Sequence, residues 1–337
     1  MDKLRMSLAA AMTLGFKPGR FYRDARLYCI NLLMDYPDGC EANCAYCGLS
    51  SGREIPQNGQ TFIRIEWPRY RVERIIDRIE SRAERVKRIC LAMVTHPEAP
   101  IDLTGLIRRF RGRLDIPISL LATPSFIEAS HLQEYKNSGA ERFTVAFDAA
   151  KQSVFEQHRG GGVGSFLDWG KYWEVFECAV AVFGAGKVGG HLIVGLGETE
   201  REMTEVFKRI RERGGETHLF SFYPEPHSAM EEREPPLMGH YRRMQMARYL
   251  MDNGIAAFED FRFDSGGRLT DFGLDAGDLK RIIRSGRPFM TSGCPGDDRA
   301  VACNRPFANS RPGPLLRNYP FEPDGRDLAR IERQLWK

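Results

Sequence analysis

The chain has 337 residues, of which 42% are hydrophobic and 28% are charged, and its net charge is +4. This length and composition allow a large buried core, while no apolar run reaches the ~18 residues of a membrane-spanning helix and the basic residues show no nucleic-acid-binding signature. The first residues lack a signal-peptide pattern, so we expect a cytoplasmic protein that has neither a membrane nor a nucleic acid as partner.

Short apolar runs alternate with longer stretches of helical periodicity along most of the chain. Strands are expected at 26–34, 87–94, 116–122, 142–147, 188–194, 217–222, 255–259 and 287–291. Helices are expected between them, at 70–86, 101–113, 128–138, 167–184, 200–213, 237–253 and 275–285. Repeated strand–helix units predict an α/β fold with a parallel sheet, and eight units suffice to close a (β/α)8 barrel of the TIM type with its active site at the carboxyl ends of the strands.

The barrel is expected to span 26–291, with a basic helical extension at 1–25 before it and a cysteine-containing tail at 292–337 after it. The basic residues near the start are Lys3, Arg5, Lys17, Arg20, Arg23 and Arg26. Their excess over the acidic residues of the same segment equals the net charge of the whole chain. Such an arm suits an acidic partner. A solvated helix face followed by a loop explains the charges equally well.

Three closely spaced cysteines follow the first expected strand. Cys40, Cys44 and Cys47 form a C-x-x-x-C-x-x-C motif, with Tyr46 directly before the last cysteine. A cluster of four irons held by three thiolates keeps one iron open to a small chelating molecule. A zinc knuckle is the alternative, but zinc needs four ligands and the next cysteine is Cys90. The triplet therefore favours a 4Fe-4S cluster with an open iron.

A second motif lies at the end of the fifth expected strand, where an apolar run leads into Gly195-Leu196-Gly197-Glu198. Glycines at a strand end let a ligand approach the backbone closely. Taken without the cysteines, the segment is explained as a tight turn from a strand into a helix.

Together the triplet and the segment His191–Thr199 resemble the radical S-adenosylmethionine (SAM) superfamily. In that superfamily SAM binds the open iron and is cleaved to a radical that abstracts hydrogen from the substrate. The resemblance implies that the triplet holds the SAM cluster and that Tyr46 belongs to the SAM site. It also implies that Ile193 and Val194 line the adenine pocket, while Glu198 mainly holds its own loop.

The same resemblance points to polar residues at other strand ends. Asp148 follows the fourth strand, where these barrels place a polar residue against the SAM ribose, and a carboxylate can accept both ribose hydroxyls. Arg159 is a candidate partner for the SAM carboxylate, because guanidinium and carboxylate pair bidentately; a surface arginine in a glycine-rich loop explains it about equally well. The segment 95–98 occupies the position that usually binds the SAM amino group.

Four further cysteines are expected to converge inside the barrel. In a closed barrel the eighth strand adjoins the first, so Cys294 would lie near Cys29 on the first strand and Cys90 on the second. Cys294 and Cys303 stand among prolines, glycines and polar residues, where a metal is the simplest reason for them. Strand cysteines are often only small buried hydrophobes, so Cys90 is the least secure candidate. The four thiolates suit an auxiliary 4Fe-4S cluster.

Across most of its length the chain resembles biotin synthase, but two of the three cysteine positions for that enzyme's 2Fe-2S cluster hold no cysteine here. Residues 20–321, with the tail from Cys294 to Phe307, look like the biotin-synthase-related, two-protein lipoyl synthases. That resemblance implies sulfur insertion into an octanoyl chain on an acidic lipoyl carrier protein, with the auxiliary cluster as sulfur donor. It also implies a homologous radical SAM partner and an electron donor such as ferredoxin or flavodoxin.

Two alternatives stay open at this point. One is another radical SAM reaction in which the second cluster only relays electrons or binds substrate. The other is a non-catalytic iron–sulfur carrier, which would need neither Asp148 nor the glycine-rich loop.

Overall fold

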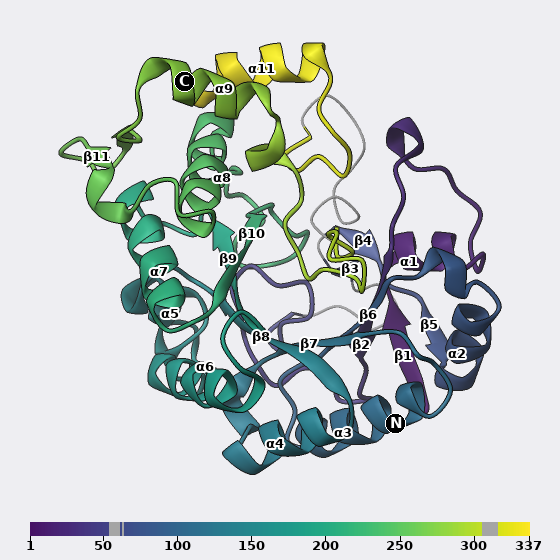
Figure 1. Cartoon of the computed structure of the whole chain (residues 1–337). Helices are drawn as coiled ribbons and strands as arrows, with labels where there is room; N and C mark the ends of the chain where they lie inside the picture. Colours follow the sequence, from purple (N-terminus) through teal and green to yellow (C-terminus); the bar gives the residue numbers. More distant parts are fainter. Residues whose placement is uncertain (54–60, 63, 305–315) are drawn as a thin grey trace.

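The computed structural model describes residues 1–53, 61–62, 64–304 and 316–337. Its centre is a curved eight-stranded sheet with the strand order β10-β9-β8-β7-β6-β2-β1-β5 (Figure 1). Six neighbouring strands run parallel: β2 (Cys29–Met34), β6 (Arg88–Ala92), β7 (Ile118–Ala122), β8 (Ala140–Asp148), β9 (Val188–Val194) and β10 (Glu216–Ser221). β1 (Lys3–Met6) and β5 (Arg69–Arg71) extend this sheet as an antiparallel edge.

Helices alternate with the parallel strands and cover the outer face of the sheet (Figure 1). They are α2 (Val72–Glu80), α3 (Ala99–Arg111), α4 (Ala129–Asn137), α5 (Gln152–His158), α6 (Trp169–Phe183) and α7 (Glu200–Glu212). α3 shows why they pack there: Leu103, Leu106 and Phe110 lie on one side of the helix and are fully buried. The predicted α/β fold with a mostly parallel sheet is confirmed.

The seventh and eighth expected strands are wrong. The residues expected as the seventh strand instead close α8 (Met238–Asp252), because the backbone N–H groups of Ile255 and Ala256 both donate to Leu250 O. The residues expected as the eighth strand form a 3₁₀ turn, Arg287–Phe289, which contains a proline and therefore lacks one ladder donor. Among the described residues the sheet thus has six parallel strands and no hydrogen-bonded closure into a barrel.

The N-terminal segment is built into the body of the protein. Its first strand pairs with β2, and α1 (Leu8–Thr13) follows on a serine cap. Two of its basic side chains are also engaged internally. Arg5 donates to Asp35 at 2.7 Å, and Arg23 pairs with Asp327 at 2.6 Å. The predicted basic arm therefore offers fewer free charges than the sequence suggests.

The C-terminal third adds a layer beyond β10. It consists of α8, the hairpin of β11 (Arg262–Phe263) and β12 (Leu269–Asp271), α9 (Ala276–Arg284) and α11 (Gly325–Leu335). A short hairpin of β3 (Thr61–Phe62) and β4 (Ile65–Glu66) lies near the sheet. None of the described helices has the length and apolar character needed to cross a membrane.

Candidate active site

The cysteine triplet lies in the loop after β2, at the carboxyl end of the parallel strands. The loop is tied to its surroundings by backbone bonds from Glu41 N to Thr95 O at 2.8 Å and from Ala45 N to His158 O at 2.8 Å. The Asn43 side chain adds a bond to Val163 O at 2.7 Å. These bonds come from the loops after β6 and α5, so several elements hold the triplet in place.

A buried polar network links the triplet to the end of β8. Tyr46 donates its hydroxyl to Asp148 Oδ2 at 2.7 Å, and His191 Nδ1 lies 2.7 Å from Asp148 Oδ1. The ladder between β8 and β9 shifts register just before Asp148, whose φ of 60° is in the left-handed region that aspartate tolerates better than most residues. This kink turns the carboxylate toward both partners.

Arg159 supplies the positive charge of this network. Its guanidinium donates to the carbonyls of Ala146 and Phe147 and to the Tyr172 hydroxyl, and it lies 3.3 Å from Asp148 Oδ2. Burial acts to raise the pKa of Asp148, but Arg159, with help from His191 and Tyr46, lowers that pKa below its ordinary value. Asp148 is therefore a buried carboxylate whose two oxygens are already hydrogen-bonded.

Glu198 holds the glycine-rich loop, as predicted. Its two carboxylate oxygens accept from Gly195 N at 2.6 Å and Leu196 N at 2.9 Å. Gly195 has a φ of 107°, and a Cβ there would stand 2.7 Å from the ring of Pro236. The turn therefore requires glycine at this position.

A mostly apolar cavity, partly open to solvent, lies over the triplet. The predicted site residues that line it are Cys40, Cys44, Tyr46, Cys47, Asp148, Arg159 and Ile193. Val194, the next residue on β9, is fully buried and does not line it. Its place at an adenine pocket stays a prediction.

Two buried threonine hydroxyls lie at this cavity. Thr95 Oγ1 and Thr123 Oγ1 are buried, line the cavity and make no hydrogen bond among the described residues. A buried hydroxyl without a partner is costly, so a polar ligand is a physical reason for both. Thr95 belongs to a segment that the sequence singled out, whereas Thr123 and the buried, cavity-lining Glu225 were missed, since nothing in their local patterns marks them.

The second cysteine group also comes together. Asn31 on β2 donates its Nδ2 to the Cys29 sulfur at 3.6 Å and to the Cys303 sulfur at 3.9 Å, while Cys90, Cys294 and Cys303 line one cavity. An eighth strand beside the first was expected to bring these cysteines together, but a turn does so instead. Cys294 and Cys303 face each other across a hairpin-like turn, with Cys303 N donating to Cys294 O at 3.0 Å. Arg88 on β6 anchors this turn through a bond to Pro295 O.

A second, smaller cavity lies against this group. Cys90, Cys294 and Cys303 line it, whereas Cys29 is fully buried beside it. Three residues, Leu121, His191 and Phe220, line both cavities and so form a common wall. Cys178 lies half-buried on α6 and lines neither cavity.

Burial dominates the chemistry of the thiols. It raises the pKa of Cys44, Cys47 and Cys294 above the ordinary value for a thiol. Thiolates at these positions need a compensating positive charge, which iron provides. Within the described ranges no three His, Cys, Asp or Glu side chains are arranged around a single metal ion.

A model of the radical SAM superfamily matches residues 34–210, just over half of the chain. No curated protein sequence matches significantly. Among solved structures the chain is similar to methylornithine synthase (PylB), with 14% identity, a TM-score of 0.49, and coverage of 82% of this chain and 84% of the other.

Two further solved structures are similar at the level of the fold. The hydrogenase maturase HydG from Carboxydothermus hydrogenoformans has 16% identity and a TM-score of 0.46, over 88% of this chain and 74% of the other. Coproporphyrinogen III oxidase (HemN) from Escherichia coli has 15% identity and a TM-score of 0.40, over 81% and 60%.

Proposed function

The chain belongs to the radical SAM superfamily, and on that basis we propose that it is a sulfur-inserting radical SAM enzyme of the lipoyl synthase type. Its substrate would be an octanoyl chain carried on a lipoyl carrier protein, and the reaction would replace a C–H bond of that chain by a C–S bond. The family implies SAM and a 4Fe-4S cluster. A second, auxiliary cluster is part of the proposal.

Cys40, Cys44 and Cys47 are the residues proposed to hold the SAM cluster. When bound, a cluster of this kind supplies the electron that cleaves SAM to the hydrogen-abstracting radical. The chain's own residues contribute by positioning the groups of the site. Tyr46 ties the triplet loop to Asp148, and Arg159 keeps that carboxylate charged. Because both oxygens of Asp148 have protein partners, we propose that it orients the site and meets the SAM ribose only by exchanging one of them.

The cavity over the triplet supports SAM and an acyl chain as ligands. Thr95 and Thr123 offer free hydroxyls to the polar end of SAM, and Ile193 offers an apolar surface to the adenine. The remaining walls include Leu33, Phe62 and Phe222, which suit a hydrocarbon chain. Arg159 has its Nη atoms engaged within the protein, which favours positioning over direct binding of the SAM carboxylate.

The observation that carries the sulfur-insertion proposal is the common wall between the two cavities. A substrate carbon next to His191 and Phe220 in the first cavity would lie one side-chain layer from the second cysteine group. A cluster held there would be the source of sulfide for that carbon. A second cluster that only relays electrons needs no such adjacency.

The proposed partners are an octanoylated acidic carrier protein, a homologous radical SAM protein and an electron donor such as ferredoxin or flavodoxin. Arg20 and Arg26 are exposed in the N-terminal segment and are the basic residues best placed to meet an acidic carrier.

The test is iron and sulfide analysis with Mössbauer spectra of the anaerobically reconstituted wild type and of a Cys40/Cys44/Cys47→Ala triple variant. We expect about eight irons to fall to about four. Sulfur transfer to an octanoylated carrier peptide, with loss of cluster sulfide, is then expected in the wild type only. About four irons falling to none would eliminate the second cluster and with it the sulfur-insertion proposal. Retention of all cluster sulfide during turnover would instead point to a redox role.

A further inference from the structure

The second cavity contains a histidine that the sequence did not single out. His218 lies on β10, is only 8% exposed and lines this cavity together with Cys90, Cys294 and Cys303. Neither ring nitrogen has a hydrogen-bond partner among the described residues. A buried donor or acceptor that lacks a partner is costly, and this ring carries one of each. The burial of such a ring calls for a compensating interaction.

The neighbouring sheet residues leave room for this ring but give it no partner. A Cβ at position 189 would stand 2.7 Å from His218 Nε2, so Gly189 on β9 makes the space that the imidazole occupies. The nearest charged groups are Glu216 and Arg142, which pair with each other, and Arg248, which pairs with Asp252. The environment thus favours a ligand that enters from the cavity.

Three cysteines and two histidines line the cavity. His191 Nδ1 already lies 2.7 Å from Asp148 Oδ1, whereas neither nitrogen of His218 has a partner among the described residues. The three cysteines and His218 therefore offer four donors to a four-iron cluster, and imidazole is an established iron ligand in iron–sulfur proteins. Cys29 is fully buried and lies outside the lining, unlike the other three cysteines.

We propose that Cys90, Cys294, Cys303 and His218 are the four ligands of the auxiliary cluster, and that Cys29 supports the cluster from behind without binding iron. This inference rests on the proposed function, because it assumes a second cluster at this place. The sequence favours Cys29 over Cys90 as a ligand of the auxiliary cluster. The proposal makes Cys90 a ligand and leaves Cys29 without iron.

A histidine ligand has an electronic consequence. Replacing thiolate by neutral imidazole removes a negative charge from the cluster, and histidine ligation raises reduction potentials where it is known in 2Fe-2S proteins. The reduced auxiliary cluster should therefore show coupling to ligand nitrogen. Its potential should fall when His218 is replaced by cysteine.

The experiment uses full-length protein in the Cys40/Cys44/Cys47→Ala background, where only the auxiliary cluster remains. The variants are His218→Ala, His218→Cys and Cys29→Ala, and His240→Ala serves as control because it removes a buried imidazole from α8, outside the cavity lining. The readouts are iron content, pulsed EPR for ¹⁴N coupling, with ¹⁵N-histidine labelling to confirm its origin, and the reduction potential.

We expect nitrogen coupling in the background protein, in Cys29→Ala and in His240→Ala. His218→Cys should keep about four irons but lose the coupling and have a lower potential, while His218→Ala should lose the coupling together with part of the iron. Coupling that persists in His218→Cys, or loss of the cluster in Cys29→Ala but not in His218→Ala, would overturn the ligand assignment.

Failure of the proposed function gives a different result. If Cys294→Ala leaves the iron content of the background protein unchanged, or if that background binds no iron, there is no auxiliary cluster at this place. If Cys294→Ala removes the iron while the His218 variants change nothing, only the ligand assignment fails.

Discussion

At the scale of single residues, the contact that most directly joins chemistry to fold is the bond from Tyr46 to Asp148. Tyr46 precedes the last cysteine of the triplet, and Asp148 ends β8, so one hydrogen bond connects the cluster loop to the far side of the sheet. The carboxylate is charged and buried, which makes this a charge-assisted bond. Loss of this hydrogen bond should make the loop that carries the cysteine triplet less stable.

Tyr46→Phe should therefore destabilise the protein by roughly 1–3 kcal/mol, the cost of leaving a buried charged acceptor with one partner fewer. We also expect faster loss of the SAM cluster on exposure to oxygen. Chemical denaturation and the decay of cluster absorbance measure the two effects. Tyr135→Phe is the matched control, because the Tyr135 hydroxyl is buried without a partner among the described residues. Equal effects of the two substitutions would contradict the proposed link.

The two free hydroxyls of the first cavity give a second expectation at this scale. Thr95→Val and Thr123→Val should each weaken SAM binding by about 3- to 10-fold, since each removes one hydrogen bond worth about 0.5–1.5 kcal/mol. Calorimetric titration of the reconstituted protein with SAM measures this. Thr13→Val in α1, outside the cavity, is the control. Unchanged SAM affinity in both cavity variants would exclude these hydroxyls from the SAM site.

At the scale of secondary-structure elements, the antiparallel edge of the sheet depends on one carboxylate. Asp35 directly follows β2 and accepts from Arg5 on β1 and Arg69 on β5. A single side chain thus joins three strands. Burial acts to raise the pKa of Asp35, but the two arginines outweigh it and lower that pKa below its ordinary value.

Asp35→Asn should lower the free energy of unfolding at pH 7 by roughly 1–3 kcal/mol, because two arginines lose their charged partner. The lowered pKa also sets a pH dependence. The unfolded chain binds a proton at Asp35 near pH 4, before the folded protein does. The stabilisation is therefore complete above that pH and is lost as the pH falls toward the folded-state pKa.

Urea unfolding at pH 7, 4 and 3 tests this expectation, because the stabilisation is lost only below about pH 4. The difference between wild type and Asp35→Asn should shrink toward the acid end. Asp115→Asn, at a fully exposed carboxylate, should behave as wild type. A difference that stays constant over this pH range would show that the charge of Asp35 is not what matters.

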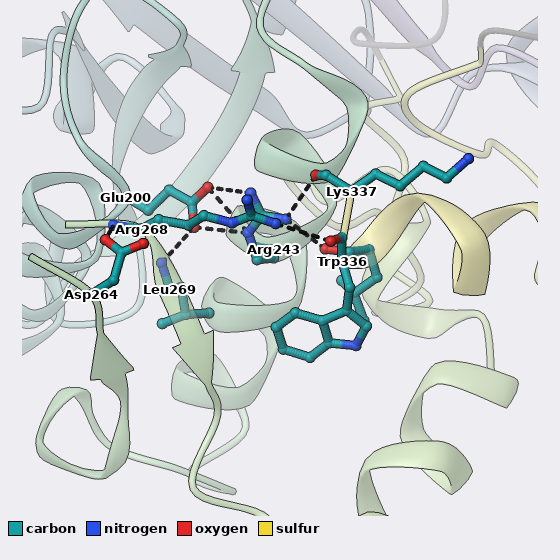
Figure 2. A network of polar contacts seen from close by, with 8 residues as sticks. Glu200, Arg243, Asp264, Arg268, Leu269, Trp336 and Lys337 are labelled. Carbon is teal, nitrogen blue, oxygen red and sulfur yellow. Dashed lines mark hydrogen bonds and ion pairs between the residues drawn. The ribbon is translucent and has the colours of Figure 1, made fainter. Parts of the chain in front are cut away.

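At the scale of the whole molecule, one buried ion pair joins several parts of the C-terminal layer to α7. Arg243 on α8 binds both oxygens of Glu200 at the start of α7 and also donates to Leu335 O at 2.6 Å, while Leu269 N donates to Glu200 at 2.8 Å (Figure 2). Two helices, a hairpin and the C-terminal residues therefore meet at this pair.

Arg243→Met should destabilise the protein by roughly 3–5 kcal/mol, because it leaves the Glu200 carboxylate buried and uncompensated. The double variant Glu200→Gln/Arg243→Met should recover part of that loss. Arg281→Met, at an exposed arginine on α9, should lie within about 0.5 kcal/mol of wild type. Thermal unfolding of these four proteins and of the Glu200→Gln single variant measures the coupling, and additive effects of the two buried substitutions would contradict it.

Much of this architecture was predictable from local pattern. Six of eight expected strands are present, because parallel strands buried on both faces read as short apolar runs between helical periods. The two remaining segments do not form strands, and the reason in each is local. In one, backbone donors cap a helix, and in the other a proline interrupts the ladder. α5 and α11 were not expected, being a short helix and a helix beyond the repeating pattern.

What the sequence determined by itself is the chemistry that depends on spacing along the chain. The triplet, the glycine-rich turn and its Glu198 brace are all local, so their roles follow from residue order and backbone geometry. The tertiary structure alone decided what depends on distance through space. It brought Cys29 and Cys90 to the turn that carries Cys294 and Cys303, made His191 part of two cavities, and left His218 buried without a partner. Burial and adjacency between distant segments set these features, and neither has a signature in residue order.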